Sequence, residues 1–312
     1  MPAFPFPAAV HNASRRRLLT AGAALAGLSA SGCASLSQPY EKAYRVKSST
    51  SDGVNLAVYE SGNPQGRPVI FVHGFAQSHE SWVKQTTSAD LSKLRLISYD
   101  LRGHGDSDKP LVKEAYLDPE KWAQDLQSVI RASGAVKPCI VAWSYGGRVI
   151  NDYLSVFGDA ELGAIDYVAA TSTGERFGLG RSYALLVPML SDDPAVAVPA
   201  TRAFLKACFE KQASEAELQQ MEAFNAKTPV AVRKLLAGRP AKYDDALRKL
   251  RVPVLVTHGS EDQISAPAMG EYTKKMVAQA KLSMYQGVGH GTFFEDPRRF
   301  NAELLELVSQ IA

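Results

Sequence analysis

Short, unbroken runs of apolar residues alternate along the chain with segments whose apolar residues recur at helical spacing. The runs are typical of strands buried on both faces of a sheet, and they cover residues 68–72, 94–99, 138–143, 165–170, 253–258 and 282–285. Helices are expected between them at residues 82–94, 118–132, 149–154, 269–278 and 297–311. Strands that alternate with helices predict an α/β fold with a mostly parallel, doubly wound sheet.

Two segments depart from this alternation. Residues 44–46 and 54–59 flank the turn sequence Ser51-Asp52-Gly53 and predict an antiparallel hairpin. Between residues 171 and 243 the strand pattern disappears, and helices are expected at 198–211 and 214–225. Large apolar residues in these helices argue against a disordered linker. They are Phe204, Leu205, Cys208, Phe209, Leu218 and Met221.

Composition and charge are those of an ordinary soluble protein. The 312 residues are 46% hydrophobic and 21% charged, and the formal net charge is +3. Arg15, Arg16 and Arg17 supply this excess, because the other 32 basic residues equal the 32 acidic residues in number. No basic patch therefore indicates a nucleic-acid partner.

The first residues have the pattern of a targeting segment. Residues 14–19 (Ser-Arg-Arg-Arg-Leu-Leu) resemble a twin-arginine export signal, and the apolar stretch at 18–28 is shorter than a membrane span. Ala30-Ser31-Gly32-Cys33 resembles a bacterial lipobox, which implies lipidation of Cys33. The expectation is an exported protein, either periplasmic or attached to the membrane through Cys33. The alternative is plain cleavage near Ser31 or Ala34 and a free periplasmic protein.

Only two other cysteines occur. Cys139 lies in a predicted strand and Cys208 in a predicted helix, and both are expected to be unpaired, buried thiols. A disulfide between them would require an oxidising compartment, and sequence alone does not establish one. No metal-ligand spacing occurs in the sequence.

Residues 138–147 combine a buried strand, an abrupt turn and a helix start, with Ser144 at the corner. Such a turn lifts a hydroxyl clear of the sheet, and the helix N-terminus offers N–H donors to a developing oxyanion. Residues 142–146 (Ala-Trp-Ser-Tyr-Gly) resemble the G-x-S-x-G nucleophile elbow of the α/β-hydrolase family. Ala142 replaces the first glycine, where a small side chain is required because strand and helix pass close together.

This resemblance implies a particular division of the chain. An export signal and linker would occupy residues 1–38, and the hydrolase core would comprise 39–171 and 247–312. A helical cap would be inserted at 172–246, over the ends of the strands.

A serine hydroxyl needs a base within hydrogen-bond reach, and the chain has six histidines. His11 lies in the N-terminal segment, and His79 is expected to be solvated at a helix start. His258 ends a strand and is expected to pack or to pair in the wall of the site. His73 and His104 match the family's loop motifs H-G-F and D-x-R-G-H-G-x-S, whose residues shape loops.

The remaining histidine, His290, follows the last predicted strand on a loop from which an imidazole can reach the elbow. Ser144, Asp262 and His290 follow the nucleophile, acid, histidine order of the α/β-hydrolase family. Asp262 lies just past a strand and matches the family's G-x-x-D pattern, and Glu261 is the alternative acid.

The resemblance also implies an oxyanion hole, formed by the backbone N–H groups of Phe75 and Tyr145. The side chains of Phe75, Trp143 and Tyr145 suggest a hydrophobic acyl pocket. Core packing is the alternative role for each of these rings.

The function that the resemblance implies is a serine hydrolase of the esterase and cofactor-free perhydrolase branch. It would cleave small carboxylic esters through an acyl-enzyme intermediate and would need no cofactor. Ser144 argues against epoxide opening and dehalogenation, which use a carboxylate nucleophile. C–C bond hydrolysis, lactone hydrolysis and perhydrolysis remain alternatives on the same triad. A non-enzymatic receptor that retains the triad is an alternative of another class.

Overall fold

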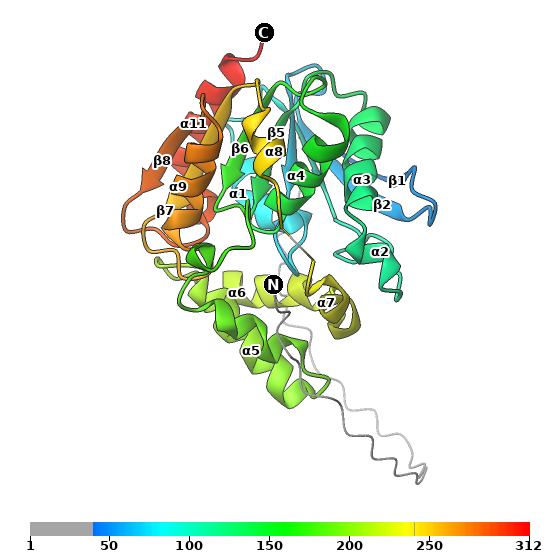
Figure 1. Ribbon diagram of the computed structural model, residues 1–312, viewed down its shortest axis with the longest axis vertical. Coiled ribbons are helices and arrows are strands. Elements are labelled where there is room, and N and C mark those ends of the chain that lie inside the picture. Colours follow the sequence, from blue (N-terminus) through cyan, green and yellow to red (C-terminus); the bar gives the residue numbers. More distant parts are fainter. Residues whose placement is uncertain (1–39, 240) are drawn as a thin grey trace, which may run out of the picture. The chain divides into compact units, whose positions relative to one another are not determined.

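The computed structural model describes residues 40–239 and 241–312 (Figure 1). The predicted export signal and Cys33 therefore lie outside the described residues. Within the described part, no helix has the length and apolar character needed to cross a bilayer. Cys139 and Cys208 are both free and buried, as expected.

An eight-stranded sheet forms the centre of the fold, in the order β1-β2-β4-β3-β5-β6-β7-β8. β1 pairs with β2 and β2 with β4 in antiparallel fashion, and all other neighbouring pairs are parallel. The strands are β1 Lys42–Lys47, β2 Asn55–Gly62, β3 Pro68–Val72, β4 Arg95–Tyr99, β5 Cys139–Trp143, β6 Ala164–Val168, β7 Val254–Gly259 and β8 Lys281–Tyr285. The mostly parallel sheet and the N-terminal hairpin are thus confirmed.

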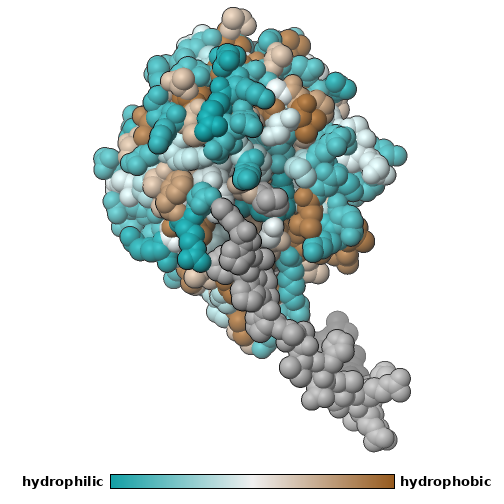
Figure 2. Space-filling model, in the orientation of Figure 1, coloured by the Kyte–Doolittle hydropathy of each residue, from teal (hydrophilic) through white to brown (hydrophobic). Residues whose placement is uncertain are grey.

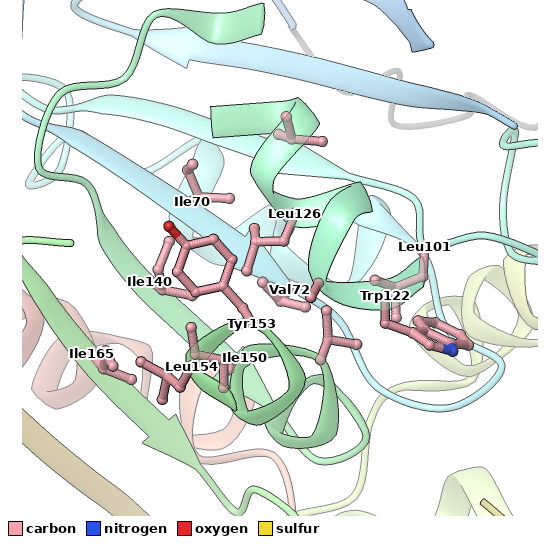
Figure 3. Close-up of a cluster of buried hydrophobic side chains, with 14 of the residues drawn as sticks. Ile70, Val72, Leu101, Trp122, Leu126, Ile140, Ile150, Tyr153, Leu154 and Ile165 are labelled. Carbon is pink, nitrogen blue, oxygen red and sulfur yellow. The ribbon is translucent and has the colours of Figure 1, made fainter. Parts of the chain in front are cut away.

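Helices cover both faces of this sheet. On one face, Leu126 and Ile150 of the neighbouring helices α3 and α4 lie over Ile70 and Ile140 of the strands (Figure 3). On the other face, Phe300 and three other apolar residues of α11 complete a second core. The helices are α1 Val83–Thr86, α2 Glu114–Leu117, α3 Pro119–Ser133, α4 Gly146–Phe157, α5 Pro194–Ala207, α6 Glu215–Ala226, α7 Val230–Leu236, α8 Asp244–Arg248, α9 Pro267–Met276, α10 Thr292–Glu295 and α11 Pro297–Ser309. Short 3-10 turns are η1 His79–Trp82, η2 Arg176–Gly178, η3 Tyr183–Leu186 and η4 Pro188–Leu190.

Local sequence signals account for where α3 begins and ends. The Asp118 side chain accepts a hydrogen bond from the Glu120 N–H, and Pro119 occupies the first turn, where its missing N–H leaves no donor unpaired. Gly134 ends the helix in the left-handed conformation, with φ of +65°. The predicted start at Asp118-Pro119 is confirmed.

The helix expected over residues 82–94 was largely wrong. Only η1 and the four-residue α1 form, and turns follow from Thr87 onward. The Ser88 hydroxyl accepts the Asp90 N–H (3.2 Å), and the Ser92 hydroxyl donates to the Ala89 carbonyl (2.7 Å). These local bonds satisfy the backbone without a helix, because serine side chains compete for the same backbone groups.

The segment between β6 and β7 contains α5, α6 and α7, which gather at one end of the sheet (Figure 1). Cys208, just after α5, accepts the His290 N–H at 2.7 Å. A Cβ atom built on Gly103 would lie 2.7 Å from Val232 of α7. Because β4 runs into the Gly103 loop and β8 into the His290 loop, α5–α7 lie over the carboxyl ends of these strands. The domain boundaries stay a prediction, and residue 246 falls inside α8.

The visible surface is mostly hydrophilic, with hydrophobic residues in small patches (Figure 2). Val136 and Leu111 are the most exposed large apolar side chains in the described part, at 77% and 66%. Scattered apolar residues of this kind are normal on a soluble protein.

Candidate active site

Ser144 stands at the corner between β5 and α4 and has φ of +53°, a conformation that L residues rarely adopt. Its N–H donates to the Val168 carbonyl (3.0 Å), and its carbonyl accepts the N–H groups of Gly147 (3.0 Å) and Thr171 (2.9 Å). A Cβ atom on Gly146 would lie 2.5 Å from the Val72 carbonyl oxygen. The strained turn is therefore bonded to β6 and to the segment that follows it, and the glycine allows β3 to approach closely on the other side.

Asp262 and His290 form a hydrogen bond between Oδ2 and Nδ1, 2.7 Å long, and both side chains are almost fully buried. The other carboxylate oxygen of Asp262 accepts the N–H groups of Ile264 (2.8 Å) and Ser265 (2.9 Å). Burial acts to raise the pKa of Asp262, but His290 and His258 outweigh it and hold the pKa well below its usual range. Asp262 is therefore ionised at neutral pH.

Of the two acids left open by the sequence, only Asp262 contacts His290. Glu261 is exposed, and its carboxylate accepts the neighbouring Ser260 hydroxyl at 3.0 Å.

The backbone of His290 is held on both sides. Its N–H donates to the Cys208 carbonyl (2.7 Å), and its carbonyl accepts the Trp143 indole N–H (3.0 Å). The side chain that precedes Ser144 thus contacts the histidine loop directly. Among the described residues, the hydrogen bond of the His290 ring is to Asp262, and none joins it to the Ser144 hydroxyl.

The N–H groups of Phe75 and Tyr145 are among the backbone donors near Ser144 that have no hydrogen-bond partner within the described chain. The Phe75 loop lies against the elbow, since a Cβ atom on Gly74 would be 3.2 Å from that of Ser144. Ala76 turns this loop with φ of +53°. The arrangement leaves two donors available for an oxyanion, which agrees with their predicted roles without testing them.

The three aromatic residues proposed for the pocket lie in different surroundings. Trp143 is 3% exposed, and its ring packs against those of Trp82 and Phe293. Tyr145 is 8% exposed, and its ring lies 5.6 Å from that of Trp122. Phe75 is more exposed than either. Substrate contacts of these residues remain a prediction.

His73 joins two loops beneath the site. Its Nδ1–H donates to the Gly74 carbonyl (2.8 Å), and its Nε2 accepts the Leu101 N–H (3.0 Å). Burial lowers the pKa of His73 to about 4, so the ring is neutral at physiological pH. His104 accompanies it in the second loop, with ring centroids 5.1 Å apart. Both histidines shape loops, as expected.

The expectation that His79 is solvated was wrong. His79 is buried, and Asp100 at the end of β4 accepts both its backbone N–H and its Nδ1–H at 2.8 Å. Its ring stacks on that of Tyr59, with centroids 3.6 Å apart. The carboxylate provides a buried partner that a local pattern around His79 does not reveal.

Glu295 was not predicted from the sequence. Its carboxylate accepts backbone N–H groups from the His290 loop and from the segment after α5. The available signal was a carboxylate five residues after His290, which the structure places at the end of α10. No cluster of three or more His, Cys, Asp or Glu side chains that could hold a metal occurs in residues 40–239 and 241–312.

Comparison with known proteins gives consistent matches. A model described as "Alpha/beta hydrolase family" matches residues 69–303. An aryl esterase candidate from Burkholderia cenocepacia has a structure similar to this chain, with a TM-score of 0.82 and 33% identity, covering 86% of this chain and 98% of its own. The esterase RhEst1 from Rhodococcus sp. ECU1013 has a TM-score of 0.79 and 32% identity, with 86% and 99% covered.

A curated relative adds a second activity to this group. The bifunctional esterase/perhydrolase DCH of Acinetobacter calcoaceticus is 24% identical over 284 residues, covering 83% of this chain and 98% of the relative. The chain is thus related to esterases and perhydrolases. From the family match over most of its length and the fold shared with these esterases, it follows that the chain belongs to the alpha/beta hydrolase family.

Proposed function

We propose that the protein is a serine hydrolase that cleaves carboxylic esters, with Ser144 as nucleophile, His290 as base and Asp262 as orienting acid. The observation that carries this proposal is the buried Asp262–His290 hydrogen bond beside a serine held in a strained elbow. A carboxylate on Nδ1 directs the other ring nitrogen, Nε2, to the reacting hydroxyl and stabilises the imidazolium that forms during attack.

The reaction follows from these positions in two steps. Ser144 Oγ attacks the acyl carbonyl while His290 takes its proton, and the developing oxyanion receives the N–H groups of Phe75 and Tyr145. His290 returns the proton to the leaving alcohol, and then activates water to release the acid. The Ser144–His290 hydrogen bond forms on substrate binding, since such bonds commonly tighten only in the complex.

The similar esterase structures support an ester as the substrate class. Hydrophobic rings at Phe75, Trp143 and Tyr145 favour an apolar acyl group over a charged one.

Replacement of the nucleophile tests the proposal. Ser144→Ala lowers kcat/KM on short aryl esters by about a thousandfold or more, because a triad acts as a unit. Ser155→Ala is the matched control, since the Ser155 hydroxyl lies on α4 and donates only to the Asn151 carbonyl (2.7 Å). A fluorophosphonate labels the parent protein and Ser155→Ala but not Ser144→Ala. Turnover by Ser144→Ala within about tenfold of the parent would rule out the assignment.

Perhydrolysis is the second candidate, favoured by the bifunctional esterase/perhydrolase relative. In this reaction hydrogen peroxide replaces water in attacking the acyl-Ser144 ester, and a peracid leaves. With acetic acid as the acyl donor, water leaves as Ser144 is acylated, and hydrogen peroxide then displaces the serine to give peracetic acid. Peracid formation from acetic acid and hydrogen peroxide, absent in Ser144→Ala, would support it.

We also propose that the protein is exported and lipidated at Cys33. The proposal rests on the arginine motif at residues 14–19 and on the Ala30–Cys33 sequence. An alkyne fatty acid supplied to expressing bacteria should label the parent and not Cys33→Ser. An unlabelled parent in the periplasmic fraction would indicate plain cleavage.

A further inference from the structure

Glu295 joins two backbone segments that are far apart in the sequence. Its Oε1 accepts the Gly289 N–H at 2.9 Å. Its Oε2 accepts the N–H groups of Glu210 (3.1 Å) and Lys211 (2.8 Å), which follow α5. Hydrogen bonds from N–H groups to a carboxylate are stronger than bonds between neutral groups. One side chain therefore fastens the histidine loop to the segment that follows α5.

The same two segments are in close contact beyond this carboxylate. His290 donates its N–H to Cys208, as described above. A Cβ atom on Gly289 would lie 2.8 Å from the Glu210 nitrogen, and one on Gly291 would lie 2.5 Å from the Phe209 ring. Glycines on either side of His290 therefore let the backbone of residues 208–211 pack directly on the loop.

We propose that Glu295 is a positioning residue for the acyl transfer, and that it acts by holding the Gly289–His290 peptide. This rests on the proposed role of His290. Gly289 has no side chain, and Glu295 is the only partner of its N–H among the described residues. With that bond and the bonds of His290 to Cys208 and Trp143, the loop is held on three sides. The imidazole is thereby kept on Asp262, in position to take the proton of the Ser144 hydroxyl when substrate binds.

A consequence concerns how the predicted cap moves. Residues 208–211 cannot separate from the histidine loop without breaking the bonds to Glu295 and displacing His290. Movement elsewhere in residues 172–246 would leave these bonds and His290 in place, so residues 208–211 belong to the site.

Kinetics of three variants test the positioning role. Glu295→Ala removes all three bonds and is expected to lower kcat by about ten- to a hundredfold with KM changed less than about threefold, because a displacement of about 1 Å in the catalytic geometry has effects of this size. Glu295→Gln retains one acceptor oxygen and turns an NH2 group toward the other N–H, so its kcat should be intermediate.

Glu303→Ala is the matched control. Glu303 is a partly buried carboxylate on α11 that accepts bonds from Ser283, Tyr285 and Arg299 and contacts neither segment. Its kcat should stay within about twofold of the parent even where its stability falls. Equal losses of kcat in Glu295→Ala and Glu303→Ala would overturn the proposal, since a general loss of stability would then explain both.

Amide hydrogen exchange provides a readout that does not depend on turnover. In the full-length protein, Glu295→Ala should accelerate exchange in residues 208–211 and 287–291, with α11 unchanged. Unchanged exchange in both segments, or accelerated exchange with parental kcat, would overturn the positioning role. If the parent protein turns over no ester, the proposed esterase function is wrong. The positioning role of Glu295 is wrong if the parent is active and Glu295→Ala retains its kcat.

Discussion

Several residues of the site hold the carboxylate of Asp262 in place. Besides Ile264, Ser265 and His290, its carboxylate lies 3.1 Å from Nε2 of His258. His258 Nε2 is also 2.9 Å from the Ser265 carbonyl, while its Nδ1 is buried without a partner in the described chain. The Nε2–H form of the ring satisfies both acceptors at once. His258 therefore helps to fix the acid that orients His290.

Replacing His258 should affect both stability and turnover. His258→Leu leaves the Ser265 carbonyl buried and unpaired, so the free energy of unfolding should fall by about 1–3 kcal/mol. The kcat should fall as well, because Asp262 loses one donor. His258→Gln places an amide N–H near the position of Nε2 and should recover most of both losses. Denaturant unfolding and ester kinetics measure the two effects, and a His258→Leu protein as stable as the parent would contradict this role.

Asp166 gives a pH prediction away from the site. It lies in β6, fully buried, with Oδ1 accepting the Thr257 hydroxyl (2.8 Å) and Oδ2 unpaired within the described residues. Burial raises its pKa to about 8. Because the folded pKa lies above the unfolded pKa of about 3.9, the folded state binds the proton more tightly. The stabilisation is full below about pH 4 and is lost as pH rises toward 8, by up to about 1.4 kcal/mol per pH unit.

Asp166→Asn should remove this dependence, because an amide stays neutral at every pH. Denaturant unfolding between pH 5 and pH 8 should show a smaller decline for the variant than for the parent. Parallel curves for the two proteins would mean that Asp166 is already ionised in the folded state.

At the scale of elements, sequence patterns predicted the strands and helices correctly where local interactions determine the structure. The apolar run at 68–72 coincides with β3, and Ser214 with Glu217 forms a capping box at the start of α6. Residues 82–94 were misjudged, because periodic apolar residues there are outweighed by the turn-forming bonds of Ser88 and Ser92. Periodicity reports which residues face a core and does not report which backbone bonds compete with a helix.

Arg233 joins the three helices α5, α6 and α7. Its guanidinium is buried and donates to neutral oxygens of Thr228 (2.9 Å), Thr201 (3.1 Å) and Asn225 (2.7 and 2.8 Å). Burial lowers the pKa of Arg233 to about 10, still well above neutrality. The charged guanidinium therefore links α5, α6 and α7 through hydrogen bonds. Among the described residues, no carboxylate forms an ion pair with it.

Arg233→Lys should loosen these helices without unfolding the sheet. A lysine ammonium keeps the charge but cannot reproduce the planar fork that reaches all three partners. Amide exchange in α5–α7 should accelerate while β3, β5 and β6 keep their protection. Acceleration spread equally over the sheet would show that these helices do not open as a separate unit.

At the scale of the whole molecule, the candidate catalytic residues could be predicted from the sequence, but the residues that hold them in place could not. Ser144, Asp262 and His290 each sit in a local motif, and chain order suggested their convergence. Glu295 and Cys208 act through backbone contacts across more than 80 positions, which no local motif records. The same holds for Arg239, whose guanidinium is buried against the Trp122 ring at 4.8 Å.

Arg239, which follows α7, joins the segment between β6 and β7 to α4, the helix after the elbow. It forms a buried ion pair with Asp152 of α4 and donates to the Tyr145 hydroxyl at 3.1 Å. The Tyr243 hydroxyl donates to the other Asp152 oxygen (3.1 Å). Residues 208–211 and Arg239 thus attach this segment to two different parts of the site.

A double-mutant cycle on this pair measures that attachment. Arg239→Met leaves Asp152 buried without its cation and should reduce the free energy of unfolding by about 3–5 kcal/mol. Asp152→Asn in the same chain removes the uncompensated charge, so the double variant should be more stable than Arg239→Met alone. Because Tyr145 loses a partner in both, kcat/KM should remain reduced in the double variant even as stability returns. Strictly additive losses would show that the two residues are not coupled, and recovery of kcat/KM together with stability would show that Arg239 supports the fold and not the elbow.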